Sequence, residues 1–234
     1  MGQLRVIEVK RGIFEDNNRA ADRLRDRLQR EQTLLINLMS SPGAGKTTLL
    51  RRTIAALKDA VRIGVMEADI DGDVDARAIS EAGAKAIQIH TGGMCHLDAD
   101  MTRQGLEALG SAAFDLVVLE NVGNLVCPAE FDTGAMRNVM LLSVPEGDDK
   151  PLKYPLMFKN CQVALINKCD TLPVFDDFDC ARVKARILDR NPECRVFFVS
   201  AKTGEGFEGW IDWLRGALDA FRSGSMSAPK HYDA

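Results

Sequence analysis

Cys95 and His96 are the residues of this sequence whose types and spacing most directly suggest chemistry. They stand side by side in "TGGMCHLDAD" (91–100), in a chain with only three histidines. A thiolate beside an imidazole offers two ligands to a soft or borderline metal, and Cys127 in "NLVCPAEFD" could supply a third. We therefore predict a nickel or zinc site made of Cys95, His96 and Cys127. The alternative is a helix start at which Cys95 is buried and His96 caps the helix or faces solvent.

A glycine-rich turn, "SSPGAGKTT" (40–48), follows an apolar run and opens a helical segment. Its glycines would let backbone N–H groups surround a β-phosphate, its lysine would reach the β- and γ-oxygens, and a threonine hydroxyl would bind Mg²⁺. The strict pattern G-x-x-x-x-G-K-[ST] has glycine where this chain has Ser40, a departure that we expect to leave the chemistry intact. The residues predicted to bind nucleotide here are Gly43, Ala44, Gly45, Lys46, Thr47 and Thr48.

Two further segments indicate the base. In "LINKCD" (165–170) an aspartate can accept from both N1–H and the N2 amine of guanine, a donor pair that adenine does not offer. In "FVSAKTGEG" (198–206) a backbone N–H could meet guanine O6. Together, in this order after a phosphate loop, they predict GTP rather than ATP. The residues expected at the base are Asn167, Lys168, Asp170, Ser200, Ala201 and Lys202.

Acidic residues after two other apolar runs would complete a magnesium shell. Four aspartates, at positions 69, 71, 73 and 75, crowd "MEADIDGDVDARA" (66–78). A solvated loop accounts for at least two of them, and we expect Asp69 and Asp75 to be functional. The predicted magnesium ligands are Thr47, Asp69 and Glu120.

Glu120 and Gly123 in "VVLENVGN" could sense the γ-phosphate through water or a backbone N–H. Against the D-x-x-G-Q of small GTPases, Glu120 replaces the aspartate and Asn124 replaces the glutamine that orients water. Intrinsic hydrolysis should therefore be slow, as in a switch or timer. The predicted catalytic residues are Lys46, Asp75 and Glu120.

The elements that must position these residues can be read from continuous apolar runs of strand length. They occur at residues 33–39, 61–67, 85–90, 115–120, 138–144, 162–167 and 195–200. Helical segments lie between most of them, which predicts an α/β fold of the P-loop NTPase type: a doubly wound, mostly parallel sheet of about seven strands flanked by helices. The carboxyl ends of parallel strands share one edge, which should bring Cys127 towards Cys95 and His96.

The chain divides into three predicted parts. Residues 1–32 form an N-terminal segment with a charged amphipathic helix at 15–32, in which Leu24 and Leu28 share one face. Residues 33–222 form the GTP-binding domain. The small, polar tail at 223–234 is predicted to be disordered.

Composition narrows the class of protein. Hydrophobic content is 46%, charged content is 27% and net charge is −4, so nothing indicates a nucleic-acid groove or a membrane-binding face. The opening "MGQLRVIEVK" lacks the apolar core of a signal peptide, which favours the cytoplasm. The six cysteines do not form a disulfide framework.

The sequence resembles the HypB family, the accessory GTPases of hydrogenase nickel insertion, from roughly residue 14 to residue 221. The segments that carry the resemblance are "SSPGAGKTT", "EADIDGDVDA", "TGGMCHLDAD", "LENVGNLVCPAEFD", "SVPEGDDKPLKYPLMF" and "INKCDTLP". The resemblance implies that Cys95, His96 and Cys127 bind nickel or zinc at or near a dimer interface. It also implies that Lys150 or Lys153, in the loop 145–155, contacts phosphate across that interface, although an exposed charged loop explains them as well.

The implied function is GTP-dependent nickel delivery to the large subunit of [NiFe]-hydrogenase, with Mg²⁺ as cofactor. The implied partners are a second copy of the chain, favoured by GTP, a small zinc-containing accessory protein of the HypA type, and the hydrogenase large-subunit precursor. Some family members begin with a cysteine-rich nickel site or a long His-rich stretch, and "MGQLRVIEVK" has neither. We therefore expect metal to pass through the Cys95 site.

Three other readings remain open. A urease accessory GTPase would be expected to show a Cys-Pro-His motif, whereas here Cys95 is followed directly by His96. A regulatory GTPase without a metal role predicts that replacing Cys95 changes nothing. A metabolic kinase is disfavoured by the guanine-reading segments.

Overall fold

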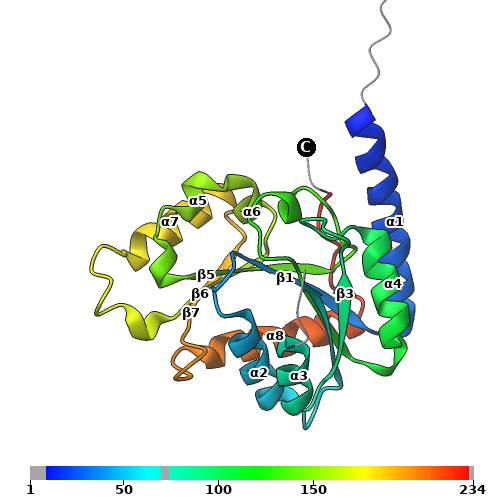
Figure 1. Cartoon of the computed structure of the whole chain (residues 1–234), viewed down its shortest axis with the longest axis horizontal. Helices are drawn as coiled ribbons and strands as arrows, with labels where there is room; N and C mark the ends of the chain where they lie inside the picture. Colours follow the sequence, from blue (N-terminus) through cyan, green and yellow to red (C-terminus); the bar gives the residue numbers. More distant parts are fainter. Residues whose placement is uncertain (1–8, 70–73, 232–234) are drawn as a thin grey trace, which may run out of the picture.

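The computed structural model describes residues 9–69 and 74–231, and of residues 9–11, 69 and 74–77 the backbone alone. Within these ranges the chain forms one parallel sheet in the order β3-β2-β4-β1-β5-β6-β7 (Figure 1). Its strands are β1 (Leu34–Ser40), β2 (Ile63–Asp69), β3 (Lys85–His90), β4 (Leu116–Glu120), β5 (Arg137–Ser143), β6 (Val163–Asn167) and β7 (Arg195–Phe198). The predicted seven-stranded parallel sheet is confirmed.

Helices cover both faces of the sheet. On one face lie α2 (Lys46–Leu57), α3 (Val74–Glu81) and α8 (Phe207–Arg222). On the other lie α1 (Val9–Glu31), α4 (Ala99–Leu109), α5 (Lys150–Lys153), α6 (Pro155–Lys159) and α7 (Cys180–Arg190). Short 3-10 turns complete the described chain: η1 (Ser111–Ala113), η2 (Cys127–Ala129), η3 (Val144–Glu146) and η4 (Cys169–Thr171).

Strand β1 shows why its apolar run is continuous rather than alternating. Leu34, Ile36 and Leu38 belong to the core beneath α2 and α8. Leu35 packs in the core beneath α1 and α4, and Met39 in the core beneath α6 and α7. A strand covered on both faces must be apolar on both, and each buried leucine contributes about 1.5–3 kcal/mol.

One polar residue interrupts β1. The buried Asn37 donates to Asn138 Oδ1 of β5 at 3.0 Å and accepts from Asn121 Nδ2 at 3.0 Å. Asn121 also accepts from the backbone N–H of Val122 at 2.9 Å. This chain of amide groups fixes the first turn after β4, where the predicted γ-phosphate sensor lies.

Helix α1 is longer than predicted, because it begins at Val9 rather than residue 15. Leu24 and Leu28 are buried, as their spacing indicated. The described part of the tail contacts the domain: the Ser227 carbonyl accepts from Arg137 at 2.9 Å, and His231 lies 3.2 Å from Asp132. The three-part division of the chain stays a prediction.

No helix in the described ranges combines the length and the apolar character needed to cross a membrane.

Candidate nucleotide and metal site

The phosphate loop joins β1 to α2 and takes a shape that needs glycine at two positions. Gly43 and Gly45 have φ values of 76° and 100°, which favour residues without a Cβ. A Cβ on Gly45 would also lie 2.7 Å from Asn167 Nδ2. The loop is therefore closed tightly against the end of β6, while among the described residues outside the loop itself no heavy atom is found within 4 Å of the Cβ position of Gly43.

Lys46, the first residue of α2, is held over the end of the central strands. Its Nζ donates to Ser40 Oγ at 3.1 Å and lies 3.8 Å from Glu120 Oε1. Ser40 is buried, so the residue that breaks the strict loop pattern serves to orient the lysine. The structure thus brings together the predicted catalytic pair Lys46 and Glu120.

Asn167 connects the phosphate loop to both predicted base-reading segments. Its Nδ2 donates to the Ala44 carbonyl at 2.9 Å, and its Oδ1 accepts from the Ala201 N–H at 3.0 Å. Lys168 adopts a left-handed backbone conformation (φ 62°) and its Nζ donates to the Gly43 carbonyl at 2.7 Å. The three loops form one hydrogen-bonded unit. A backbone N–H of the segment 198–206 was expected to meet guanine O6, and in this unit the N–H of Ala201 donates to Asn167 instead.

Asp170 lies beside the loop that follows β7. Ser200 Oγ donates to Asp170 Oδ1 at 2.7 Å and accepts from the Thr203 N–H at 3.0 Å. Ser200 is buried and Lys202 is exposed. The serine therefore orients the carboxylate predicted to read guanine.

Only some of the residues predicted to lie near Mg²⁺ have described side chains. Thr47 and Thr48 lie in the first turn of α2. Asp69 ends β2 and Asp75 lies in the first turn of α3, but their side chains fall outside the described part of the structure, as do Asp71 and Asp73 entirely.

Gly123 lies against the phosphate loop. A Cβ there would come within 3.0 Å of Pro42 Cγ and 3.2 Å of Pro42 N. The turn after β4 and the phosphate loop are therefore in direct contact, and a side chain at position 123 would push them apart.

Glu146 is a residue that the sequence did not indicate. It accepts from the Ser41 hydroxyl of the phosphate loop and from Ser143 N–H and Oγ at 2.8 and 2.7 Å. The signal available in the sequence was the capping pattern "SVPE". Lys153, by contrast, is exposed on α5 and pairs with Asp149 at 2.5 Å.

The three predicted metal ligands lie together. Cys95 Sγ is 2.9 Å from Cys127 Sγ and 3.9 Å from His96 Nδ1, and one ligand atom from each residue lies within 4.8 Å of the others. Cys95 is exposed, and α4 is capped by Asp98, which accepts from the Met101 N–H at 2.8 Å. The alternative of a buried Cys95 and a capping His96 is therefore wrong. Two thiol sulfurs and one imidazole nitrogen fit zinc or nickel.

Helix α1 holds the two segments that carry these ligands. Asn17 Nδ2 donates to the Asp132 carbonyl at 2.9 Å, and Asn17 Oδ1 accepts from the Ala99 N–H at 3.0 Å. The His96 ring stacks on Phe131 with centroids 3.8 Å apart, and Phe131 in turn contacts Phe14 at 5.0 Å. None of these α1 contacts was predicted, because they join residues distant in sequence.

The ligands differ in their readiness to bind metal. The hydrogen bond to Cys127, together with burial, raises the pKa of the Cys95 thiol. Burial lowers the pKa of His96, against the opposing effect of Asp98 and Glu130. The imidazole is thus favoured in its neutral, ligating form, whereas a metal must displace a proton from the thiols.

A single segment connects the two halves of the site. It leaves β4 at Glu120 beside Lys46, packs Gly123 against Pro42, and reaches η2 at Cys127. Between them, Asn124 Nδ2 donates to the Cys95 carbonyl at 3.2 Å. The segment thus contacts the phosphate loop at one end and the metal cluster at the other.

The other four cysteines lie away from this cluster. Cys161 and Cys194 are buried with their sulfurs 3.8 Å apart, a proximity that the sequence did not show. Burial raises the pKa of Cys169 to about 11, and also raises that of Cys180. Packing accounts for all four.

Comparisons with known proteins agree with this site. The family model "CobW/HypB/UreG, nucleotide-binding domain" matches residues 34–198. The hydrogenase maturation factor HypB of Escherichia coli (strain K12) is 45% identical over 214 residues, covering 92% of this chain and 73% of that protein. The hydrogenase/urease maturation factor HypB of Helicobacter pylori (strain J99) is 38% identical over 212 residues, covering 89% and 86%.

A solved structure is similar over nearly the whole described fold. The crystal structure of HypB from Helicobacter pylori in complex with nickel superposes with a TM-score of 0.82 at 38% identity, covering 92% of this chain and 99% of that one. A phosphate loop, a segment predicted to read guanine and a Cys/His cluster lie on one sheet edge, and with these relatives they identify the chain as a member of the HypB family of P-loop GTPases for hydrogenase maturation.

Proposed function

We propose that this protein is a GTP-hydrolysing metallochaperone that helps to insert nickel into the large subunit of [NiFe]-hydrogenase. The observation that carries the proposal is the segment from Glu120 to Cys127, which contacts the phosphate loop through Gly123 and the metal cluster through Asn124. A GTPase with an unrelated protein client would not need one ligand of a thiol–imidazole cluster, Cys127, on the same segment as its predicted γ-phosphate sensor.

In the proposed nucleotide site, Lys46 and the loop N–H groups bind the phosphates, and Asp170, oriented by Ser200, binds the guanine. Bound Mg²⁺, held by Thr47, Asp69 and Glu120, would neutralise charge on the phosphates. Asp75 is the remaining proposed catalytic residue. Asn124 donates to the Cys95 carbonyl rather than standing free to orient water, which supports slow intrinsic hydrolysis.

Nickel is the proposed cargo, bound by Cys95, His96 and Cys127, and zinc is the competing occupant. Movement of the 120–127 segment between the GTP and GDP states would change the distance between Cys127 and the other two ligands. Nucleotide state would then set nickel affinity, and nickel would set nucleotide affinity in return.

Three ligands leave a metal short of a closed shell, and a second copy of the chain could complete it. We therefore propose a homodimer favoured by GTP, in which Lys153 reaches the partner's nucleotide. The further proposed partners are a HypA-type accessory protein and the hydrogenase large-subunit precursor. We place the protein in the cytoplasm, because the thiols of the exposed Cys95 and the half-buried Cys127 need a reducing compartment to stay free for metal binding.

A second client is supported by one observation. The Helicobacter pylori relative is named a hydrogenase/urease maturation factor. We therefore propose urease as a second client, whose activation is measured beside that of hydrogenase.

The test is complementation of a bacterium that lacks its own HypB and makes both enzymes, grown at limiting nickel. We expect the wild-type chain to restore hydrogenase activity and the Cys95→Ser and Lys46→Met variants to restore less than about a tenth of it, since each removes one half of the coupled site. Cys180→Ser is the matched control and should restore full activity. Full hydrogenase activity with Cys95→Ser would contradict the metal role, and restored urease alone would identify the other client.

A further inference from the structure

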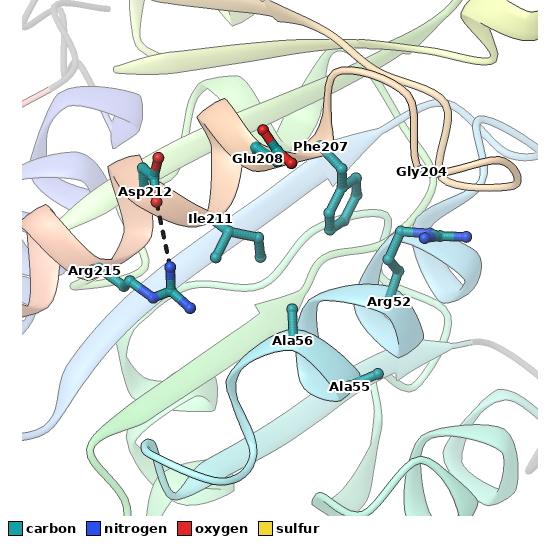
Figure 2. A pocket seen from close by; sticks show the side chains of 9 residues that line it. All are labelled: Arg52, Ala55, Ala56, Gly204, Phe207, Glu208, Ile211, Asp212 and Arg215. Carbon is teal, nitrogen blue, oxygen red and sulfur yellow. Dashed lines mark hydrogen bonds and ion pairs between the residues drawn. The ribbon is translucent and has the colours of Figure 1, made fainter.

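An open groove of about 620 Å³ runs between α2 and α8, on the sheet face away from the metal cluster (Figure 2). Ala55 and Ala56 of α2 and Ile211 of α8 line it, and Figure 2 shows Arg52 and Arg215 at its two ends. Arg215 pairs within α8 with Asp212 at 3.3 Å. Arg52 instead extends from α2 towards Gly204, in the loop that follows β7.

The Arg52 guanidinium binds the predicted guanine-reading loop at several points. Its Nε donates to the Ala201 carbonyl at 2.7 Å and its Nη2 to the Lys202 carbonyl at 2.9 Å. The loop closes over it, since a Cβ on Gly204 (φ 93°) would lie 2.6 Å from Nη1. The Cζ atom lies 5.7 Å from the centre of the Phe207 ring.

We propose that Arg52 is a positioning residue that sets the affinity and specificity of this protein for guanine nucleotides. It holds the carbonyls of Ala201 and Lys202 and thereby fixes two successive peptide groups of the predicted guanine-reading loop. The N–H of the second group, on Thr203, donates to Ser200 Oγ, which orients Asp170, so the guanidinium also supports the carboxylate predicted to read the base. This inference deepens the proposed function, because it rests on GTP being the nucleotide.

Arginine suits this role better than any other side chain. A planar guanidinium presents two donors in a fixed fork to two neighbouring carbonyls, whereas a lysine ammonium is a single, strongly hydrated point donor. The same helix begins with Lys46 and Thr47, so α2 would hold the phosphates by its first turn and the base-reading loop by its second. Helix α2 would thus preorganise both the phosphate end and the base end of the proposed nucleotide site.

A purely structural role makes a different prediction. If Arg52 only joined α2 to the loop for stability, its loss would lower Tm and leave the ratio of nucleotide affinities unchanged. The ratio of the Kd for ADP to the Kd for GDP is therefore the decisive quantity, because both constants are measured on the same folded sample.

The experiment compares wild type, Arg52→Met, Arg52→Lys and the matched control Arg215→Met. Affinity for a fluorescent GDP analogue is measured directly, and affinities for GDP and ADP are measured by competition, with Tm recorded for each protein. We expect Arg52→Met to weaken GDP binding about tenfold and to reduce the ADP/GDP ratio by a similar factor, since two charge-assisted hydrogen bonds are lost. Arg52→Lys should be intermediate, and Arg215→Met should stay within about twofold of wild type.

An unchanged ADP/GDP ratio in Arg52→Met, with or without a lower Tm, would overturn the inference while leaving the proposed function intact. If Arg52→Met does not fold, the Arg52→Lys variant provides the test. An ADP/GDP ratio equal to that of the wild type in Arg52→Lys would also overturn the inference. A wild-type chain without any preference for GDP would contradict the proposed function itself, and the inference with it.

Discussion

Replacing Cys95 with serine is expected to abolish stoichiometric nickel binding at the cluster. Changes to residues that merely support a metal ligand typically cost about 10- to 100-fold in affinity, and the loss of a thiolate ligand should cost at least about 100-fold. The measurement is nickel bound per chain after equilibrium dialysis of the protein loaded with a non-hydrolysable GTP analogue. Oligomeric mass should be recorded on the same samples.

The matched control for this prediction is Cys180→Ser, which makes the same atomic change on α7, outside the cluster. It should bind as much nickel as the wild type. Equal nickel in the Cys95→Ser and wild-type proteins would show that the cluster is not the nickel site and would leave a GTPase without a metal role.

Replacing Lys46 with methionine is expected to lower the rate of GTP hydrolysis about 100-fold or more. Its ammonium, held by Ser40 at 3.1 Å, is the positive charge placed to stabilise the transferring phosphoryl group. Single-turnover hydrolysis of radiolabelled GTP measures the rate, and binding of labelled GDP separates loss of chemistry from loss of affinity.

Lys58→Met serves as the control, because Lys58 is exposed and follows the other end of the same helix. Its rate should remain within about twofold of wild type. A Lys46→Met variant that hydrolyses GTP at the wild-type rate would mean that the phosphates lie elsewhere in the molecule.

The sheet could be predicted almost completely from the sequence, because two covered faces require continuous apolar runs and each run lay beside a helical segment. The predicted and observed elements differ in where individual strands and helices begin or end. The run 195–200 gave a strand that stops at Phe198, where the chain turns into the base-reading loop. The start of α1 at Val9 was missed because the segment before residue 15 carries no clear period.

The site was predictable where the chemistry is local. The phosphate loop and the Asn167–Asp170 segment are short motifs, and the structure places them in contact through Asn167 and Lys168. Their roles in binding nucleotide stay predictions. The Cys95–Cys127 contact was predictable only through topology, since strands β3 and β4 end at the same edge of the sheet.

Contacts that support the site could not be predicted, because they join side chains across long sequence separations. Asn17, Arg52 and Glu146 each look like an ordinary solvated polar residue in the sequence. Only the fold shows that Asn17 joins the two metal-bearing segments and that Arg52 joins α2 to the base-reading loop.

The central claim is that nucleotide state and nickel affinity are coupled through the 120–127 segment. It is tested most directly by titrating nickel into the wild-type protein loaded with Mg²⁺ and GDP, and again with Mg²⁺ and a non-hydrolysable GTP analogue. We predict nickel Kd values that differ by at least about fivefold, and an equal reciprocal effect of nickel on the ratio of the two nucleotide affinities. The same nickel Kd in both nucleotide states would contradict the account.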